Sequence, residues 1–406
     1  MTPDAARSWE AMEEEEGEGA LERVIGRFTD DAAGPTFICI AGLHGNEPSG
    51  VQGLKRVFKT LQQAKPSLNG EFVGLAGNLS ALAQHRRFID YDLNRCWSAA
   101  TVEDHAPESD FATTTGVEAR EQRELLAELE RVFDRARGEV YVLDLHSTSG
   151  DGAPFAVLND TLRNREFALA FRVTIVLGVA ENLGGTLMDY INDFGHVNIG
   201  FEAGKHDDPA TIDNAEAAVW VGLAATGCVA SGLPEVHRSR SRLTQARGPL
   251  PRVAEVRYRH AIARADGFRM EPGFLNFQRI TTGQLLARDR RGEIRSRKSG
   301  RMLMPHYQEL GEDGFFVIRE FRPHWLAASA LLRRLRFDAI VHWLPGVRRH
   351  PKYPGTLIID RRIARWRALD LLHLLGFRKQ RAIGNVLLIS RRARPRPPRP
   401  RRRPSA

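Results

Sequence analysis

The sequence predicts an α/β fold built on an open, largely parallel sheet that helices cover on both faces. One reason is that short apolar runs, such as TFICIAG and EVYVLDLH, alternate with longer segments of helical spacing. A second reason is the composition, because 42% of the 406 residues are hydrophobic and 27% are charged, as in globular proteins with a sizeable core. Functional residues in such sheets are expected at the carboxyl ends of the strands.

The predicted strands and helices follow one another in a domain that we assign to residues 21–235. Strands are expected at 36–42, 71–78, 139–146 and 198–204, helices at 51–63, 117–136 and 217–233, and a mixed run at 165–177. The segment 217–233 has 17 uncharged residues, fewer than the roughly 20 of a membrane-spanning helix. We therefore expect a buried helix there and no membrane span.

The chain changes character on either side of this domain. Residues 1–20 carry the run EEEE without the regions of a signal peptide, and are expected to form an acidic disordered leader. Residues 236–322 begin with a basic connector and continue as short runs between DG, PG, RG and SG pairs, which predicts a small β-rich domain. Residues 323–390 return to helical spacing and are expected to form a basic helical segment.

Most of the formal charge of +9 lies in the last residues, RRARPRPPRPRRRPSA, with eight arginines and no acid. The prolines exclude a helix, so we expect residues 391–406 to be a disordered tail. Such a tail is either solvated or a contact for RNA or an acidic membrane surface. Because no RNA-binding motif accompanies it, nucleic acid is an unlikely partner.

The three cysteines are Cys39, Cys96 and Cys228, which are far apart and odd in number. They predict neither a disulfide framework nor a cysteine metal site. A reducing, cytoplasmic location fits this pattern best. A homo-oligomer is compatible with the sequence.

The stretch LHGNEPSG places His44 and Glu47 three residues apart, between a predicted strand and a helix. The pair either caps the helix or supplies two of the three nitrogen and oxygen ligands that a catalytic zinc ion needs. The candidate for the third ligand is His146, where the apolar strand 139–146 ends and breaks into Ser-Thr-Ser-Gly. By itself, a strand-end histidine is more often a structural residue. Asp144, two residues earlier, suits a role behind a ligand imidazole.

The loop NLSALAQHRRFIDYDLNRCW combines charged residues with aromatic ones that indicate burial. Its arginine Arg87 and the pair Asn94 and Arg95 suit an anionic substrate, although a structural ion-pair loop is the alternative. Glu202 ends the strand at 198–204 between apolar neighbours. Burial there would raise its pKa towards the range of a general base, whereas a rim residue is the simpler interpretation.

Four motifs occur in the order GLHGNEPSG, Asn78 followed by Arg87 and DLNR, DLHSTSG, and GFEAGKH. Together they resemble the succinylglutamate desuccinylase and aspartoacylase family of zinc carboxypeptidase-like amidohydrolases, over roughly residues 21–322. The resemblance implies a three-layer α/β/α domain with a mixed, largely parallel sheet.

It also implies one zinc ion per chain and a role for each of seven side chains. The implied zinc ligands are His44, Glu47 and His146, Arg87 would polarise the scissile carbonyl, Asn94 and Arg95 would hold a substrate carboxylate, and Glu202 would be the general base.

One departure from the family concerns the substrate. The segment GTLMDYINDFGHVNIGF has Asn192 where aspartoacylases carry a further arginine, so a second anionic group lacks an obvious partner. His196, Lys205 and His206 are candidate replacements, and Tyr307 is a candidate gate residue.

The expected activity is hydrolysis of the amide of an N-acylated amino acid or similar small carboxylate. The alternatives are a zinc carboxypeptidase or peptide amidase and, in another class, a nucleic-acid or membrane-surface binder that uses the basic C-terminus.

Overall fold

The computed structural model describes residues 21–30, 33–97, 116–351, 356–360, 362–363, 371–372, 374–377, 379–383 and 386–390. The predicted leader, 1–20, and the predicted tail, 391–406, lie outside the described residues. Among the described residues, no helix combines the length and the apolar character that crossing a membrane requires.

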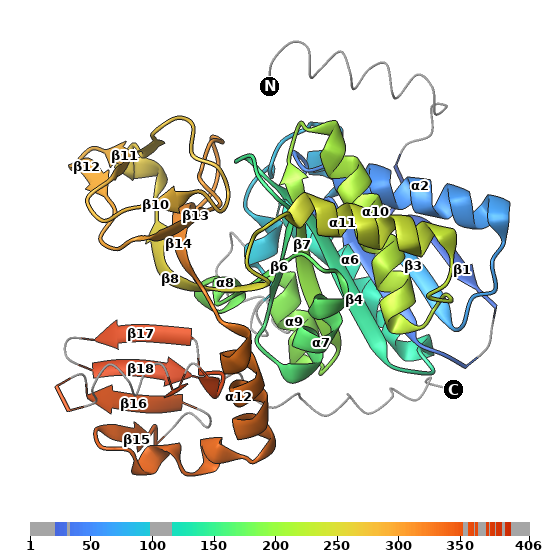
Figure 1. The fold of residues 1–406 in the computed structure, drawn as a ribbon. Coiled ribbons are helices and arrows are strands. Elements are labelled where there is room, and N and C mark those ends of the chain that lie inside the picture. Colours follow the sequence, from blue (N-terminus) through green and yellow to red (C-terminus); the bar gives the residue numbers. More distant parts are fainter. Residues whose placement is uncertain are drawn as a thin grey trace.

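The α/β domain is built on a mixed sheet, as predicted (Figure 1). Its strands lie in the order β1-β3-β2-β4-β7-β5-β6-β8 and continue into β14-β13-β10. The first eight are β1 (Val24–Thr29), β2 (Thr36–Ala41), β3 (Glu71–Ala76), β4 (Val140–Thr148), β5 (Phe155–Leu158), β6 (Thr174–Leu177), β7 (Val197–Lys205) and β8 (Val253–Ala261). The four central strands β3, β2, β4 and β7 are parallel to one another, so their carboxyl ends meet at one edge.

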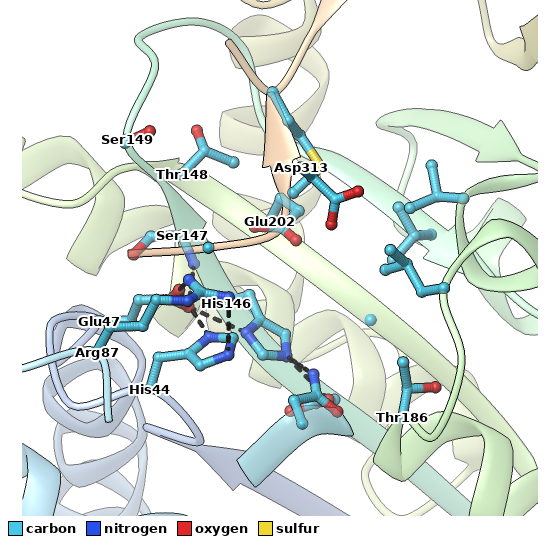
Figure 2. A pocket seen from close by; sticks show the side chains of 18 of the residues that line it. His44, Glu47, Arg87, His146, Ser147, Thr148, Ser149, Thr186, Glu202 and Asp313 are labelled. Atoms are coloured by element: carbon cyan, nitrogen blue, oxygen red, sulfur yellow. Dashed lines mark hydrogen bonds and ion pairs between the residues drawn. The ribbon is translucent and has the colours of Figure 1, made fainter. Parts of the chain in front are cut away.

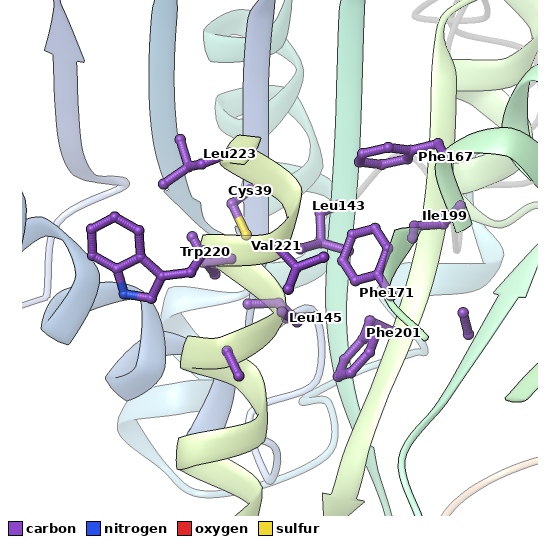
Figure 3. Packing of buried hydrophobic residues seen from close by; sticks show 14 of the residues in the cluster. Cys39, Leu143, Leu145, Phe167, Phe171, Ile199, Phe201, Trp220, Val221 and Leu223 are labelled. Carbon is purple, nitrogen blue, oxygen red and sulfur yellow. The ribbon is translucent and has the colours of Figure 1, made fainter. Parts of the chain in front are cut away.

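Helices cover both faces of this sheet because residues in a strand alternate between the two faces. On one face, α2 (Ser49–Ala64), α7 (Leu162–Ala170) and α10 (Pro209–Thr226) enclose a core that includes Leu143 and Phe201 (Figure 3). On the other face, α6 (Val117–Arg135) and α9 (Leu187–Asp193) pack on a second core around Ile38 and Ile40. The fully apolar strand runs follow from this double coverage.

Short elements complete the domain: α3 (Leu79–Ala83), η1 (Leu93–Arg95) and α8 (Val179–Asn182). The mixed run at 165–177 divides into the end of α7 and the strand β6. The prediction of a basic connector after residue 234 is wrong, because these residues form the helix α11 (Pro234–Arg247). Its buried residues are only Val236, Ser239 and Leu243, which share one face that packs on α10.

The region predicted to be β-rich extends the main sheet from β8 through β14 (Asp313–Glu320), β13 (Gly300–Leu303) and β10 (Arg279–Ile280). A second sheet contains β9 (Arg269–Met270), β11 (Leu285–Asp289) and β12 (Gly292–Arg295), and the turn η2 (Arg264–Asp266) lies between β8 and β9. A small core of its own, including Phe274, Leu286 and Phe315, joins the two sheets.

Among the described residues after 322, the helical elements are α12 (Pro323–Arg334) and the short turns η3 (Phe337–Ala339) and η4 (Val341–Trp343), and Leu371, Leu372 and Leu374 are also helical. The rest corrects the prediction of a helical segment, because β15 (Val347–Arg349), β16 (Thr356–Asp360), β18 (Val386–Ser390) and β17 (Lys379–Ile383) form an antiparallel sheet (Figure 1). The helical spacing of IARWRALDLLHLLGF also predicts a helix at 363–377, much of which lies outside the described residues.

Candidate active site

The carboxyl ends of three parallel strands bring the predicted site residues together. His44 and Glu47 lie in the loop between β2 and α2. His146 lies near the end of β4, which pairs with β2 on one side and with β7 on the other. Glu202 of β7 is the direct register partner of His146. The loop that carries Glu47 and the strand that carries His146, which are 99 residues apart in sequence, therefore share one edge of the sheet.

His44, Glu47 and His146 form a compact group whose ligand atoms lie within 4.8 Å of one another (Figure 2). The Glu47 carboxylate lies between the two rings, with Oε1 2.9 Å from His44 Nδ1 and Oε2 3.0 Å from His146 Nδ1. All three side chains are at most 9% exposed. Two imidazole nitrogens and a carboxylate oxygen are the ligand set of a catalytic zinc ion, which leaves one position open.

The far nitrogen of each imidazole contacts a second carboxylate. His146 Nε2 is 2.9 Å from Asp144 Oδ2, and His44 Nε2 is 3.0 Å from Asp92 Oδ1. This contact orients a ligand imidazole and increases its basicity. Asp144 thus has the place expected from the sequence, whereas the role of Asp92 was not predicted.

The charges around this group favour a cation. Burial acts to lower the pKa of His146, but Asp144 and Glu47 raise it well above its usual value. Burial acts to raise the pKa of Glu47, but His44 and His146 lower it well below its usual value. A metal ion would supply the positive charge that these carboxylates stabilise on the histidine.

Glu202 faces the same space without a hydrogen-bond partner for its Oε2 atom among the described residues. The residue is 7% exposed. Burial, partly offset by the nearby His146, raises the pKa of Glu202 to about 8. A carboxylate in this state is suited to proton transfer near neutral pH.

Arg87 lies beside the histidine and carboxylate group. Its Nη2 atom is 3.1 Å from Asp92 Oδ2, and its Nη1 atom is 3.5 Å from Glu47 Oε1. Its buried Nε–H has no acceptor among the described residues. The guanidinium therefore keeps a donor available at the cleft.

A buried glutamate that sequence reasoning missed holds the loop that carries Arg87. Glu118 of α6 is fully buried and accepts hydrogen bonds from the backbone N–H groups of Ile89 at 2.6 Å and Asp90 at 2.9 Å. It also accepts a bond from Asn78 Nδ2 at 3.1 Å. The available signal was a group of polar residues, Glu118, Glu121 and Gln122, that begins the face of α6 on which leucines are buried further along.

Asn94 and Arg95 line the cleft in the short helix η1. Asn94 Nδ2 is 3.5 Å from His146 Nε2, and Asn94 Oδ1 accepts a bond from the Leu187 N–H. Arg95 forms an ion pair with Asp313 of β14 at 3.2 Å, which the sequence did not indicate. The buried Arg95 Nε–H nevertheless has no hydrogen-bond acceptor among the described residues.

The candidate replacement cations lie elsewhere. His196 packs on Phe133 with 4.6 Å between ring centroids, and burial lowers its pKa to about 4. Lys205 pairs with Asp207, while His206 contacts Ser147 Oγ at 2.8 Å. As far as the structure describes the chain, neither these residues nor Asn192 nor Tyr307 line the cleft. Tyr307 instead donates to the Glu271 carbonyl at 2.8 Å.

The β-rich part of the chain forms the roof of the cleft. Met304, His306, Gln308, Glu312 and Asp313 all line it, opposite the strand ends. The cleft encloses about 880 Å³, counting the part open to solvent. This size suits a small molecule.

Comparison with known proteins agrees with this geometry. The family model described as "Succinylglutamate desuccinylase/Aspartoacylase catalytic domain" matches residues 33–220. A probable aspartoacylase of Acaryochloris marina is 29% identical over 125 residues, which cover 30% of this chain and 38% of that protein. A succinylglutamate desuccinylase of Pseudomonas putida is 33% identical over 82 residues, which cover 20% of this chain and 24% of the relative. The matches thus span well under two thirds of either relative.

Solved structures share the fold. A succinylglutamate desuccinylase/aspartoacylase from Rhodobacter sphaeroides superposes with a TM-score of 0.53 at 18% identity, covering 72% of this chain and 87% of the other. A succinylglutamate desuccinylase from Vibrio cholerae gives 0.51 at 15% identity, covering 81% and 86%. The predicted α/β architecture is confirmed by these neighbours.

Proposed function

Because the domain at residues 33–220 belongs to the succinylglutamate desuccinylase/aspartoacylase family, we propose that the protein is a zinc-dependent amidohydrolase that deacylates a small N-acylated amino acid. The observation that carries this proposal is the arrangement of His44, Glu47 and His146 opposite the unpartnered carboxylate of Glu202. A metal site and a base that share one cleft are what hydrolysis of an amide requires.

The residues present fit one zinc ion. His44 and His146 would bind through their Nδ1 atoms, and Glu47 would bind through its carboxylate, with Asp92 and Asp144 orienting the rings. Bound zinc supplies Lewis acidity, which polarises a carbonyl group and lowers the pKa of a coordinated water molecule to about 7.

Glu202 takes the proton from the attacking water and passes it to the nitrogen of the leaving amine. Its raised pKa of about 8 makes it able to accept and release that proton near neutral pH. Its position directly across from His146 supports this role.

Arg87 donates a hydrogen bond to the scissile carbonyl oxygen, where negative charge develops as the water attacks. Donors that are already in place for this charge lower the barrier because they need little reorganisation. Asp92 fixes one end of the guanidinium, and Glu118 fixes the backbone of the loop. The donor is therefore held in place before the substrate arrives.

Asn94 and the Nε–H of Arg95 bind the carboxylate of the substrate amino acid. Asp313 accepts a hydrogen bond from Nη2 of Arg95, whereas Nε makes no hydrogen bond among the described residues and has the Glu312 carboxylate 3.8 Å away, a longer contact that a substrate carboxylate would replace. A peptide-length substrate is disfavoured, because residues 304–313 roof the cleft. This roof favours a deacylase over a carboxypeptidase or peptide amidase.

The proposal is tested with a panel of N-acylated amino acids, in which ninhydrin detects the released amine. We expect turnover that dialysis against a chelator abolishes and that stoichiometric zinc restores. The absence of turnover by the zinc-loaded protein across acetyl, succinyl and longer acyl donors would refute the proposed function.

A further inference from the structure

One wall of the cleft is apolar. It is formed by Val157, Val179, Ala180, Leu183, Met188 and, from the roof, Met304. These side chains belong to one hydrophobic cluster that joins the α/β domain to the β-rich part, so the wall is the exposed edge of a packed core. Gly200 permits the close packing, since a Cβ atom there would lie 2.8 Å from Val157 Cγ2 and 3.0 Å from Met188 Sδ.

The Met188 end of the wall lies away from His44, Glu47 and Arg87. In Figure 2 the group of His44, Glu47 and Arg87 is on one side of the cleft, whereas Thr186, which precedes Met188, is on the other. Since one molecule of substrate must reach the metal site and also fill the cleft, its other end contacts this wall.

No free cation in the described lining is available to a second anionic group of the substrate. Of the two arginines, Arg87 is paired with Asp92 and Arg95 with Asp313. Burial lowers the pKa of His306, so its ring is neutral near pH 7. The lining contains five carboxylates, namely Glu47, Asp144, Glu202, Glu312 and Asp313. A second carboxylate on the substrate would therefore lose its hydration without gaining a counter-charge.

We propose that the apolar wall binds an uncharged aliphatic group, so that the substrate is an N-acyl amino acid with a single carboxylate. This inference rests on the proposed function and narrows it. It excludes efficient hydrolysis of succinylated amino acids and of acyl-aspartate, because each of these places a second carboxylate in the cleft.

Two matched substrate pairs test the inference with the zinc-loaded protein. The first pair is the N-butanoyl and N-succinyl derivatives of one amino acid, which differ by a terminal carboxylate. The second pair is N-acetyl-leucine and N-acetyl-aspartate. We expect kcat/KM to be at least about a hundredfold higher for the uncharged member of each pair.

A variant series then assigns the preference to the wall. Met188→Arg should reduce the preference for the uncharged substrate at least tenfold by adding a counter-charge, whereas the matched control Met188→Leu should keep it. If the wild type prefers the dianionic member of either pair by more than tenfold, the inference is overturned while the proposed function stands. If no acyl amino acid is hydrolysed at all, the proposed function fails, and this inference fails with it.

A second inference comes from a different surface. Six of the nine exposed large hydrophobic side chains among the described residues lie between residues 325 and 343. They are Trp325, Leu331, Leu335, Phe337, Ile340 and Trp343, with exposures of 41% to 75%, and we call them the tryptophan face. Leu331 lies in the last turn of α12 and Leu335 is the residue that follows this helix, and η3 and η4 come next and pack on one another.

The segment that carries the tryptophan face is rich in arginine. Residues 321–350 contain six arginines and a single acid, Asp338. Five of these arginines, Arg322, Arg334, Arg336, Arg348 and Arg349, form no ion pair with a described residue. Pairing of two copies through this face would bring the arginines together, which disfavours a self-association.

We propose that the tryptophan face docks on an anionic lipid surface. Tryptophans with exposed aliphatic side chains and a cationic rim are the composition of a peripheral membrane contact. Nucleic acid explains the arginines but not the exposed Leu and Ile side chains.

Co-sedimentation of the full chain with phosphatidylcholine vesicles, with and without phosphatidylglycerol, tests this docking. We expect binding only to the anionic vesicles, and a loss of about tenfold or more in the double variant Leu331→Ser, Trp343→Ser. Leu275→Ser, an exposed leucine in the β-rich part, is the matched control and should bind like wild type. Unchanged binding of the double variant would overturn the proposal and leave the arginine tail as the contact. The proposal is equally overturned if RNA displaces the protein from vesicles and binds the double variant as tightly as wild type.

Discussion

Replacing Glu202 by glutamine removes one property of the side chain and keeps the others. The amide has the size of the carboxyl group and forms hydrogen bonds, but it cannot take a proton from water. Because burial raises the pKa of Glu202 to about 8, the carboxyl group of the metal-free protein is mostly protonated at pH 7. A neutral amide therefore introduces no new charge into the cleft.

The expected loss of rate follows from this difference. Loss of a general base typically lowers the rate about 10²–10⁴-fold, which corresponds to roughly 2.7–5.5 kcal/mol in the activation barrier. The three candidate zinc ligands are other residues, so the variant should retain its metal. The Oε2 atom has no hydrogen-bond partner among the described residues, so the fold should lose less than about 1 kcal/mol.

The assay compares kcat, zinc content and thermal midpoint for Glu202→Gln and wild type. Glu216→Gln is the matched control, because burial also raises the pKa of that carboxyl group on α10, away from the cleft. The control should retain wild-type kcat. If Glu202→Gln keeps its zinc and turns over within about threefold of wild type, Glu202 is not the base. A variant that loses zinc or melts much earlier would show a ligating or structural role instead.

Four further predictions concern the metal, the tail, the hydrogen bonds of Glu118 to the loop that carries Arg87, and the response to acid. Elemental analysis should find near-stoichiometric zinc in wild type and little in His146→Ala, and a fully loaded variant would remove His146 from the site. Deletion of residues 391–406 should leave kcat and KM for a small substrate unchanged, and a drop in kcat beyond about tenfold, roughly 1.4 kcal/mol, would contradict this. Glu118→Gln should lower the free energy of unfolding by about 1–3 kcal/mol, since an amide cannot accept all the hydrogen bonds made to the buried carboxylate. A melting curve like that of wild type would show that these hydrogen bonds do not stabilise the loop. Burial lowers the pKa of His196 to about 4, whereas the pKa of histidine in an unfolded chain is about 6.5. As the pH falls from 6.5 to 4, the unfolded state therefore binds the proton first, and the free energy of unfolding decreases. His196→Phe should recover about 1–2 kcal/mol of that loss, and equal acid sensitivity in chemical denaturation would argue that His196 titrates normally.

The parts of the fold that follow from the sequence are those with a strong local pattern. Strands β2, β3, β4 and β7 are apolar because helices bury both of their faces, so they stand out as apolar runs. Helix α11 lacks such a pattern, because it buries only three residues against α10 and is basic elsewhere. The antiparallel sheet of β15 to β18 was missed for another reason: its short strands lie among segments that also have helical spacing.

Part of the candidate site also follows from local sequence patterns, whereas the part that bears on substrate specificity does not. His44, Glu47, His146 and Glu202 each follow or end an apolar strand, so the order of strands in a parallel sheet is enough to bring them together.

The Asp313 carboxylate that pairs with Arg95 comes from a segment 218 residues away. Its arrival depends on how the β-rich part packs over the cleft, and no local pattern encodes that contact. Met304 and the other roof residues enter the cleft in the same way. In the proposed function, the chemistry is thus assigned to short motifs at strand ends, and the choice of substrate to residues that remote packing brings to the cleft. A chain can therefore keep the motifs of its family while its roof and apolar wall select a different acyl amino acid.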